Sequence, residues 1–582
     1  MPGPIVLTSR AKTYLAGSIL ALLATAYVVF CTYTPITLVG GSNLDDELFI
    51  AHARLLASGH WLGPFSQFTL MKGPGYSAFL ALSAWSGLSV ASSEAIFNCL
   101  AVGALAWVIW RLSHSAFAAL AIFIVTLWNP GLLSLRVLRQ AIYSAQTLMF
   151  MALIAYAFFG TRGRTRIIMM SLLAGLVLGW FWLTREEGAW IVPGVVLLVC
   201  GAMLRARVLE GSIRAPTIAS ASMLLAFSSV LLAFRLANLI AYGSFIGVDT
   251  QEPNFIGAVD ALQSVEAGDP IPYVPVSAET RAAIYDVIPA FASLKPYLDP
   301  PGGSPFERPG CRWYPWACDE IAGGWFIWAL RDAAASAGHY QSPADAAAFF
   351  HRLRDQVRTA CAKHDLVCDP WPIPFMPRIS SAQAWGIPGS FRRVLMNITF
   401  RWPPLLNQGP SSGRASDIFN DWMFLNQPVY MPTVERVPVG NLFVTYAGHA
   451  SWVGLALRTR KFLIDAYGVI VPAIFWPGLA AMFIGLWSIG ARRAAADPII
   501  IMAAAAWTLL LTRVALIALI DASAFPAASW EYAAPAFPLA CIAPLLSLAV
   551  LLNQPLLLTW PSRFRKRTVA PHEDNATMPA AE

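Results

Sequence analysis

Ten long apolar segments, separated by polar connections, run along the chain. They cover residues 14–33, 93–110, 115–130, 140–160, 167–183, 189–204, 217–242, 464–487, 497–520 and 532–552. Each is near the roughly 20 residues that a helix needs to cross about 30 Å of hydrocarbon. The pattern predicts an all-α polytopic membrane protein with about ten transmembrane helices.

Basic residues are concentrated in every second connection between these segments. With the N-terminus inside the cell, the inner connections carry Arg111, the runs 162–166 and 205–214, Arg492 with Arg493, and the tail 563–567. Because arginine and lysine favour the cytoplasmic side, both termini are expected there. The first segment lacks a small-residue cleavage site, so we expect it to be a retained span and not a signal peptide.

The first outer connection, residues 34–92, contains a helical pattern and a further apolar stretch. In 45–58, Leu48, Phe49, Leu55 and Leu56 recur at helical spacing, which favours a helix lying flat on the membrane. The apolar stretch 76–88 is interpreted as partly embedded and non-crossing, because a crossing there would turn the basic connections outward.

Between residues 243 and 463 the long apolar segments stop, and about 220 residues are enough for a separate extracytoplasmic domain of mixed, mainly helical structure. Ser342 and Pro343 predict the start of a helix there, with Phe349, Leu353 and Val357 on one face. The expected organisation is a membrane core over 1–242, this domain over 243–463, final spans over 464–552 and a cytoplasmic tail over 553–582.

Composition agrees with this membrane assignment. The chain is 57% hydrophobic and only 13% charged, far from the balance of a soluble domain. The formal net charge is +7, and the clusters of basic residues stand between apolar spans. This position indicates membrane topology and not a nucleic-acid surface. The lipid bilayer is therefore the expected partner, and no nucleic acid is.

Four of the eight cysteines fall in the outer domain: Cys311, Cys318, Cys361 and Cys368. An even number in an oxidising compartment favours two disulfides. Pairing of neighbours, 311 with 318 and 361 with 368, is the simplest of three connectivities. The alternative is a zinc site built from Cys361, His364 and Cys368, although this spacing is not a standard zinc pattern.

Charged residues gather at the outer ends of the spans. The first outer connection holds Asp45, Asp46, Glu47 and Lys72; the second holds Arg136, Arg139, Gln140 and Tyr143; the third holds Arg185, Glu186 and Glu187. A carboxylate can accept the proton of an attacking hydroxyl, and cations can neutralise a departing phosphate. Together they suit group transfer from a phosphate-linked donor. Each pair is equally compatible with an interfacial ion pair that anchors the spans.

Three stretches carry a resemblance to a known family: Asp45–Arg54, Gly59–Pro64 and Lys72–Tyr76. They resemble the first outer loop of the C-type (GT-C) glycosyltransferases, such as protein O-mannosyltransferases and aminoarabinose transferases. The resemblance extends to about Gly194. It implies an enzyme of the bacterial inner (plasma) membrane that moves a hexosyl or pentosyl unit, with inversion, from a polyprenyl-phosphate donor to an extracytoplasmic glycan, lipid or protein acceptor.

The resemblance also implies roles for particular residues. The family's essential aspartate maps onto Asp45, with Asp46 as second choice, and its loop lysine maps onto Lys72, although Gly73 interrupts the usual Lys-Pro-Pro. Gln140 stands where many relatives have an acid after Arg139, so either Glu186 or Glu187 takes that role or one carboxylate is enough. No obligatory cofactor or metal is expected, and a divalent ion is the alternative.

In the resulting hypothesis Asp45 and Asp46 are the catalytic residues, and Lys72, Arg139 and Arg185 bind the donor phosphate. Glu47, Arg136, Gln140, Tyr143, Glu186 and Glu187 support them, and apolar surfaces near the second outer connection hold the isoprenoid. A transporter or flippase is the competing class. Charges at span ends and the lack of duplicated halves disfavour it. An anchored binding module is a third reading, but ten spans exceed what anchoring requires.

Overall fold

A computed structural model describes residues 9–39, 42–370, 376, 378–401, 411–427, 450–492 and 497–552. Within these ranges the chain is all α-helical, apart from short 3₁₀ and π-helical turns and three isolated β-bridges. The predicted fold class is confirmed. The predicted tail, 553–582, and Arg493 lie outside the described residues.

Seven helical segments among the described residues are long and apolar enough to cross a membrane. They correspond to α4 (Val90–Ser113), α6 (Gln140–Ala155) with η2 (Tyr156–Gly160), α7 (Arg164–Thr184), η3 (Gly188–Ile191) with α8 (Val192–Glu210), α9 (Arg214–Tyr242), α20 (Ala450–Arg492) and α21 (Pro498–Ser523). Shorter apolar stretches lie in α1 (Ser9–Tyr33), α5 (Ala116–Leu127) and α23 (Ala536–Leu552). Each predicted apolar segment thus matches one helix, while a total of ten crossings stays a prediction.

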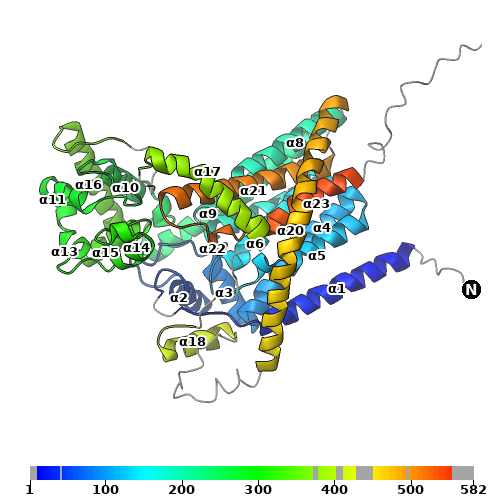
Figure 1. The fold of residues 1–582 in the computed structure, drawn as a ribbon, viewed down its shortest axis with the longest axis horizontal. Coiled ribbons are helices and arrows are strands. Elements are labelled where there is room, and N and C mark those ends of the chain that lie inside the picture. The colour runs from blue at the N-terminus through cyan, green and yellow to red at the C-terminus, as the bar shows by residue number, and fades with distance from the viewer. Residues whose placement is uncertain are drawn as a thin grey trace, which may run out of the picture.

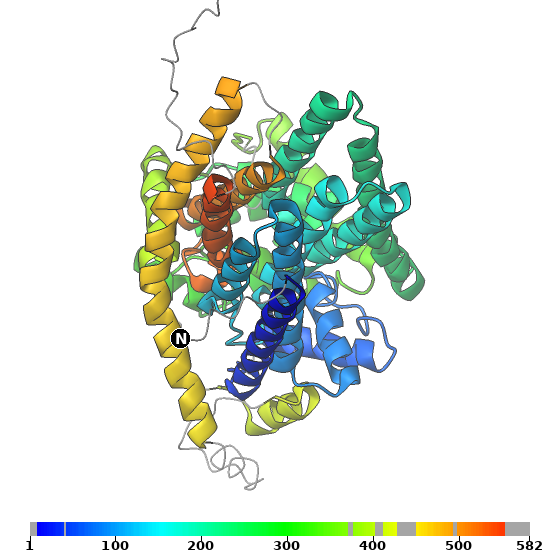
Figure 2. The same cartoon turned by 90° about the vertical axis from the view of Figure 1, so that its right-hand side faces the viewer.

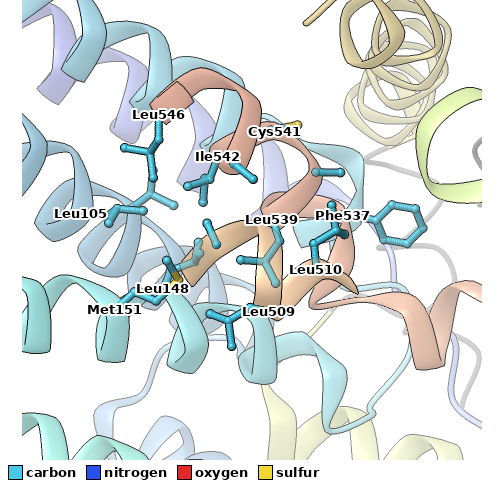
Figure 3. Packing of buried hydrophobic residues seen from close by; sticks show 14 of the residues in the cluster. Leu105, Leu148, Met151, Leu509, Leu510, Phe537, Leu539, Cys541, Ile542 and Leu546 are labelled. Carbon is cyan, nitrogen blue, oxygen red and sulfur yellow. The ribbon is translucent and has the colours of Figure 1, made fainter. Parts of the chain in front are cut away.

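The early and late helices share one hydrophobic core. Figure 3 shows its centre, where side chains of α4, α6, α21 and α23 meet: Leu105, Leu148, Met151, Leu509, Leu510, Leu539, Ile542 and Leu546. The long helix α20, gold in Figure 2, runs along one edge of this bundle. Packing of α21 against α8 and α23 brings the C-terminal part of the chain beside the first 200 residues.

The first outer connection contains two short helices, α2 (Asp46–Ala57) and α3 (Gly75–Ser86). Each has 12 residues, about 18 Å of helix at 1.5 Å per residue, which is too short to cross the hydrocarbon. The helix over 45–58 was predicted, whereas 76–88 was expected only as an apolar, non-crossing segment, and the structure shows it to be largely helical. Figure 1 places them, with α22 (Trp530–Ala533), between the bundle and the outer helical region.

The outer helical region has its own core. Its helices are α10 (Pro253–Ser264), α11 (Ala278–Val287), α12 (Pro289–Ala292), α13 (Lys295–Leu298), α14 (Glu307–Trp313), α15 (Trp325–Ser336) and α16 (Pro343–Ala362). Phe291, Phe326 and Phe349 are buried at its centre. Ser342 caps α16 by accepting the Asp345 backbone N–H, so the predicted helix start is confirmed.

Both predicted disulfides are present, between Cys311 and Cys318 and between Cys361 and Cys368. The zinc alternative therefore loses its thiolate ligands. After α16 the described chain continues with α17 (Ser381–Met396), η6 (Asn397–Arg401) and α18 (Ala415–Leu425). In Figure 1, α17 leads from the outer region back over the bundle.

Arg331 of α15 attaches the outer region to the first outer connection. Its side chain is 1% exposed, and one Nη donates to Asp249 at 2.5 Å. The other Nη donates to the backbone carbonyl of Gln67. The guanidinium also lies against the rings of Phe255 and Tyr340. This buried pair fixes how the outer helices sit over the loop.

We expect Arg331→Met to lower the free energy of unfolding of the outer region by about 3–5 kcal/mol, because Asp249 would keep a buried charge without its partner. Urea-dependent proteolysis of residues 249–370 measures this. Arg358→Met is the matched control: Arg358 is 58% exposed and lies 3.6 Å from Asp260, so its loss should change stability by about 1 kcal/mol or less. Equal losses in both variants would contradict the anchoring role of Arg331.

Candidate active site

Four segments from three outer connections meet at the end of the bundle that faces the outer region. They are the start of α2, the turn between α2 and α3, the segment before α6, and the segment between α7 and η3. Asp45, Lys72, Arg139 and Arg185 come from these four places. Their ion pairs form four groups, together called the ion-pair network here, which are linked by chain neighbours and by a hydrogen bond from Gly73 to Glu186.

Asp45 and Lys72 form the first pair, with Nζ 2.5 Å from the carboxylate. Lys72 also donates to the carbonyl of Leu44 and lies 5.1 Å from the centroid of the Phe49 ring. The lysine side chain is only 7% exposed, whereas the Asp45 side chain is 40% exposed. The pair thus presents its carboxylate outward and its cation inward.

Asp46 points the other way. Its side chain is 2% exposed and lies 2.6 Å from Arg136, and it also accepts the Val39 backbone N–H. Arg136 in turn lies 3.7 Å from Glu531 of α22. Asp46 therefore links the loop to the C-terminal part of the bundle, and Asp45 is the more accessible of the two adjacent acids.

Glu186 connects the second pair to the lysine turn. Arg139 donates to Glu186 at 2.6 Å, and Glu186 accepts the Gly73 backbone N–H at 3.3 Å. A Cβ atom on Gly73 would collide with the Leu183 carbonyl. This close approach gives a physical reason for the glycine that interrupts the expected Lys-Pro-Pro pattern.

Glu187 lies between two guanidinium groups. Arg185 is 2.5 Å from its carboxylate and Arg513 of α21 is 3.5 Å away. Arg185 stacks against the rings of Tyr143 and Tyr532, and Arg513 donates to the Tyr532 carbonyl. Two arginines that share one carboxylate leave this corner of the site with an excess of positive charge.

The other predicted support residues, Tyr143, Gln140 and Glu47, make no ion pair with the described residues. Tyr143 stacks on Phe181 and accepts a hydrogen bond from the Trp190 indole at 3.0 Å. Gln140 lines a small crevice with Arg136, and its buried side-chain Nε2 has no hydrogen-bond partner within the described ranges. Glu47 makes no ion pair with any described residue, so it is not part of the network.

Two residues of the site were missed in the sequence analysis: Arg513 and Glu531. Arg513 is an isolated charge inside an apolar span, which is itself a signal of function or of a buried partner. Glu531 has no such signal. It lies in the short α22, and only the packing of α21 and α23 brings it to Arg136.

The electrostatic environment separates the two adjacent aspartates. Burial by itself would raise the pKa of Asp45, but Lys72, with Arg139 and Arg136, outweighs it and holds that pKa below its usual value. For Asp46, burial prevails over the Arg136 contacts and raises the pKa to about 6. Glu187 resembles Asp45: Arg185 and Arg513 outweigh burial and lower its pKa to about 2. Asp45 is thus ionised at neutral pH, and Asp46 is close to its titration point.

A cavity of about 540 Å³ opens beside Asp45. One wall is the first outer connection, with Asp45, Gln67 and Phe68, and the other is the outer region, with Trp325 and Trp328. A larger cavity of about 830 Å³ lies beside α17, but none of the predicted site residues lines it. Because Asp45 belongs both to the ion-pair network and to the smaller cavity, the smaller one is the candidate substrate site.

A divalent ion was the alternative considered for the acids of this site. Within the described ranges, no group of three or more His, Cys, Asp or Glu side chains is placed to hold an ion. Asp45, Asp46, Glu186 and Glu187 each face a cationic side chain instead.

Comparison with known proteins gives a likeness in fold only. No family model matches the sequence, and no curated protein matches it. Among solved structures, the chain is similar to the archaeal oligosaccharyltransferase AglB from Archaeoglobus fulgidus, with 12% identity and a TM-score of 0.40. That match covers 94% of this chain and 51% of the other, so the chain spans about half the length of AglB.

The chain is also similar to ArnT from Cupriavidus metallidurans. The identity is 14% to the apo structure and 13% to the structure with undecaprenyl phosphate, with TM-scores of 0.32 and 0.31. Each match covers 88% of this chain and 78% of ArnT. AglB and ArnT are both C-type glycosyltransferases, the class that the first outer connection resembles in sequence. With TM-scores this low, the likeness is one of general layout.

We expect Lys72→Met to raise the pKa of Asp45. The substitution removes the main group that lowers this pKa. Burial, which raises the pKa, is then opposed only by Arg139 and Arg136. The carboxyl should therefore stay protonated to a higher pH than in the wild type. Infrared difference spectroscopy across pH 3–8 measures this, with the Asp45 band assigned by its loss in Asp45→Asn.

Lys295→Met is the control for this titration, because Lys295 is an exposed lysine of the outer region and is not among the groups that shift the pKa of Asp45. Its Asp45 band should titrate as in the wild type. An unchanged titration in Lys72→Met would mean that the ion pair does not govern the charge of Asp45.

Proposed function

We propose that this protein is a glycosyltransferase that moves a sugar from a polyprenyl-phosphate donor to an acceptor on the extracytoplasmic side of the membrane, with inversion at the anomeric carbon. One observation carries the proposal. The Asp45 carboxylate borders the 540 Å³ cavity on one side and the buried, cation-rich network on the other. An acid at such a boundary is positioned to act on an acceptor while cations hold a donor phosphate.

The donor end of the reaction needs positive charge. A sugar phosphodiester carries one negative charge, and the phosphate that leaves carries a second. Lys72, Arg139, Arg185 and Arg513 supply cations from three outer connections and from α21. Arg185 and Arg513 suit this role best, since they share a single carboxylate. Two of the similar solved structures contain dolichol-phosphate and undecaprenyl phosphate, carriers of the class proposed here.

The transfer balances as a single displacement. An acceptor hydroxyl oxygen bonds to the anomeric carbon as the bond from that carbon to the phosphate oxygen breaks. The polyprenyl phosphate leaves with the bonding electrons, and the hydroxyl proton passes to Asp45. A phosphate that draws Lys72 away from Asp45 would raise the pKa of Asp45 and make it a stronger base. In this way donor binding would prepare the acid for the second substrate.

The orientation follows from charge. The basic connections 162–166 and 205–214 lie at the opposite ends of α7, α8 and α9 from Arg185 and Glu187. The positive-inside rule then puts the acids and the outer region outside the cytoplasm, which for a bacterium is the outer face of the inner membrane. A lipid-linked donor could reach the site from within the bilayer.

Asp45→Asn should reduce transfer by about 10²–10⁴-fold, because an amide cannot accept the proton, while expression and folding stay normal. Transfer of radiolabelled sugar from a polyprenyl-phosphate donor pool to membrane acceptors measures it. Asp355→Asn, a change at an exposed acid of α16, is the matched control and should keep wild-type activity. Full activity in both Asp45→Asn and Asp46→Asn would refute the mechanism, and flux of intact donor across vesicles without transfer would favour a flippase.

A further inference from the structure

We propose that the cavity between the first outer connection and α15 binds the acceptor, and that this acceptor is a glycan without acidic groups whose ring stacks on Trp328 or Trp325. The inference rests on the proposed function for the role of Asp45. It adds the chemical class of the acceptor and assigns a binding role to the outer region.

The shape of the cavity fits a small carbohydrate. Its volume of about 540 Å³ lies within the roughly 300–1,000 Å³ typical of small-molecule sites. Trp325, Trp328 and Asp332 stand at helical spacings of three and four residues, so one face of α15 lines the wall. Phe68 and Phe306 add aromatic surface from the loop and from the start of α14.

Trp328 is the main candidate for a stacking platform. Its side chain is partly exposed, and it makes no ring contact and no hydrogen bond among the residues that the structure describes. The indole therefore borders the cavity with an N–H that has no hydrogen-bond partner and a ring that no other described aromatic ring contacts. The C–H groups of a sugar ring carry partial positive charge and favour the negative face of an aromatic ring. A hydroxyl can then accept the indole N–H.

Charge in the cavity selects against acidic ligands. The carboxylates of Asp45 and Asp332 both belong to its lining, and Asp332 accepts a hydrogen bond from the Gln67 amide at 3.2 Å. The one described cation of the lining, Arg331, is 1% exposed and is already paired with Asp249. An anionic sugar or a phosphate would meet two carboxylates and no available cation. Neutral hydroxyls can instead donate to both acids.

The test uses the full-length protein in nanodiscs and an array of neutral, amino-bearing and acidic oligosaccharides. We expect binding to a subset of neutral or amino-bearing glycans and none to acidic ones. Trp328→Ala should weaken that binding by about 2–10-fold, whereas Trp328→Phe, which keeps a ring, should retain most of it. Saturation-transfer NMR on a bound glycan should show the strongest transfer to the protons of one ring face.

Trp313→Ala is the matched control, because Trp313 is a 54% exposed tryptophan of the same region that does not line the cavity. It should bind the array as the wild type does. The proposal would be overturned by any of three results: no binding to any glycan, binding of acidic glycans, or equal binding by the wild type and Trp328→Ala.

A second pair of measurements separates this proposal from the transfer reaction. Arg139→Gln should slow transfer from the polyprenyl-phosphate donor but leave glycan binding unchanged. Selective glycan binding in a protein that transfers no sugar would refute the proposed function and keep the binding site. Transfer without selective glycan binding would refute the proposed acceptor site and keep the proposed function.

Discussion

Paired burial of opposite charges at one end of the helix bundle is the constraint on which the rest of the structure depends. Breaking a buried pair by removing one partner typically costs about 3–5 kcal/mol, far more than an exposed pair contributes. Arg136 with Glu531 and Arg513 with Glu187 join parts of the chain that lie more than 300 residues apart. These ion pairs therefore hold the second and third outer connections against the C-terminal helices, and Asp46 ties the first connection to Arg136. The shared apolar core of α6, α21 and α23 supports that arrangement.

This constraint also separates two neighbouring acids that are chemically identical in sequence. At the start of α2, Asp45 and Asp46 project in different directions, one to Lys72 beside an open cavity and one to Arg136 in the interior. Their pKa values move in opposite directions as a result, down for Asp45 and to about 6 for Asp46. Asp46 is best understood as the residue that orients the loop, and Asp45 as the acid that can meet a substrate.

Local and periodic signals in the sequence predicted most of the fold. The apolar segments, α2, the Ser342 cap of α16 and both disulfides depend on residues close in sequence. The site was predicted only in part. The structure pairs Lys72 with Asp45 and Arg139 with Glu186, and their role toward a donor phosphate stays a prediction. Glu531 and Trp328 could not be predicted, because their positions depend on how α22 and α15 pack against distant loops.

The two walls of the cavity have different origins, and this has a consequence for specificity. The loop wall, with Asp45, is fixed by the ion-pair network and by the close approach of Gly73 to Leu183. The α15 wall, with Trp328, is carried by a region with its own hydrophobic core and reaches the loop mainly through Arg331. Substitutions on α15 can therefore change what is recognised without disturbing the cations that we propose hold a phosphate. A fold built in this way can keep one donor chemistry while its acceptor changes, because no ion pair of the network depends on the residues that line the outer wall.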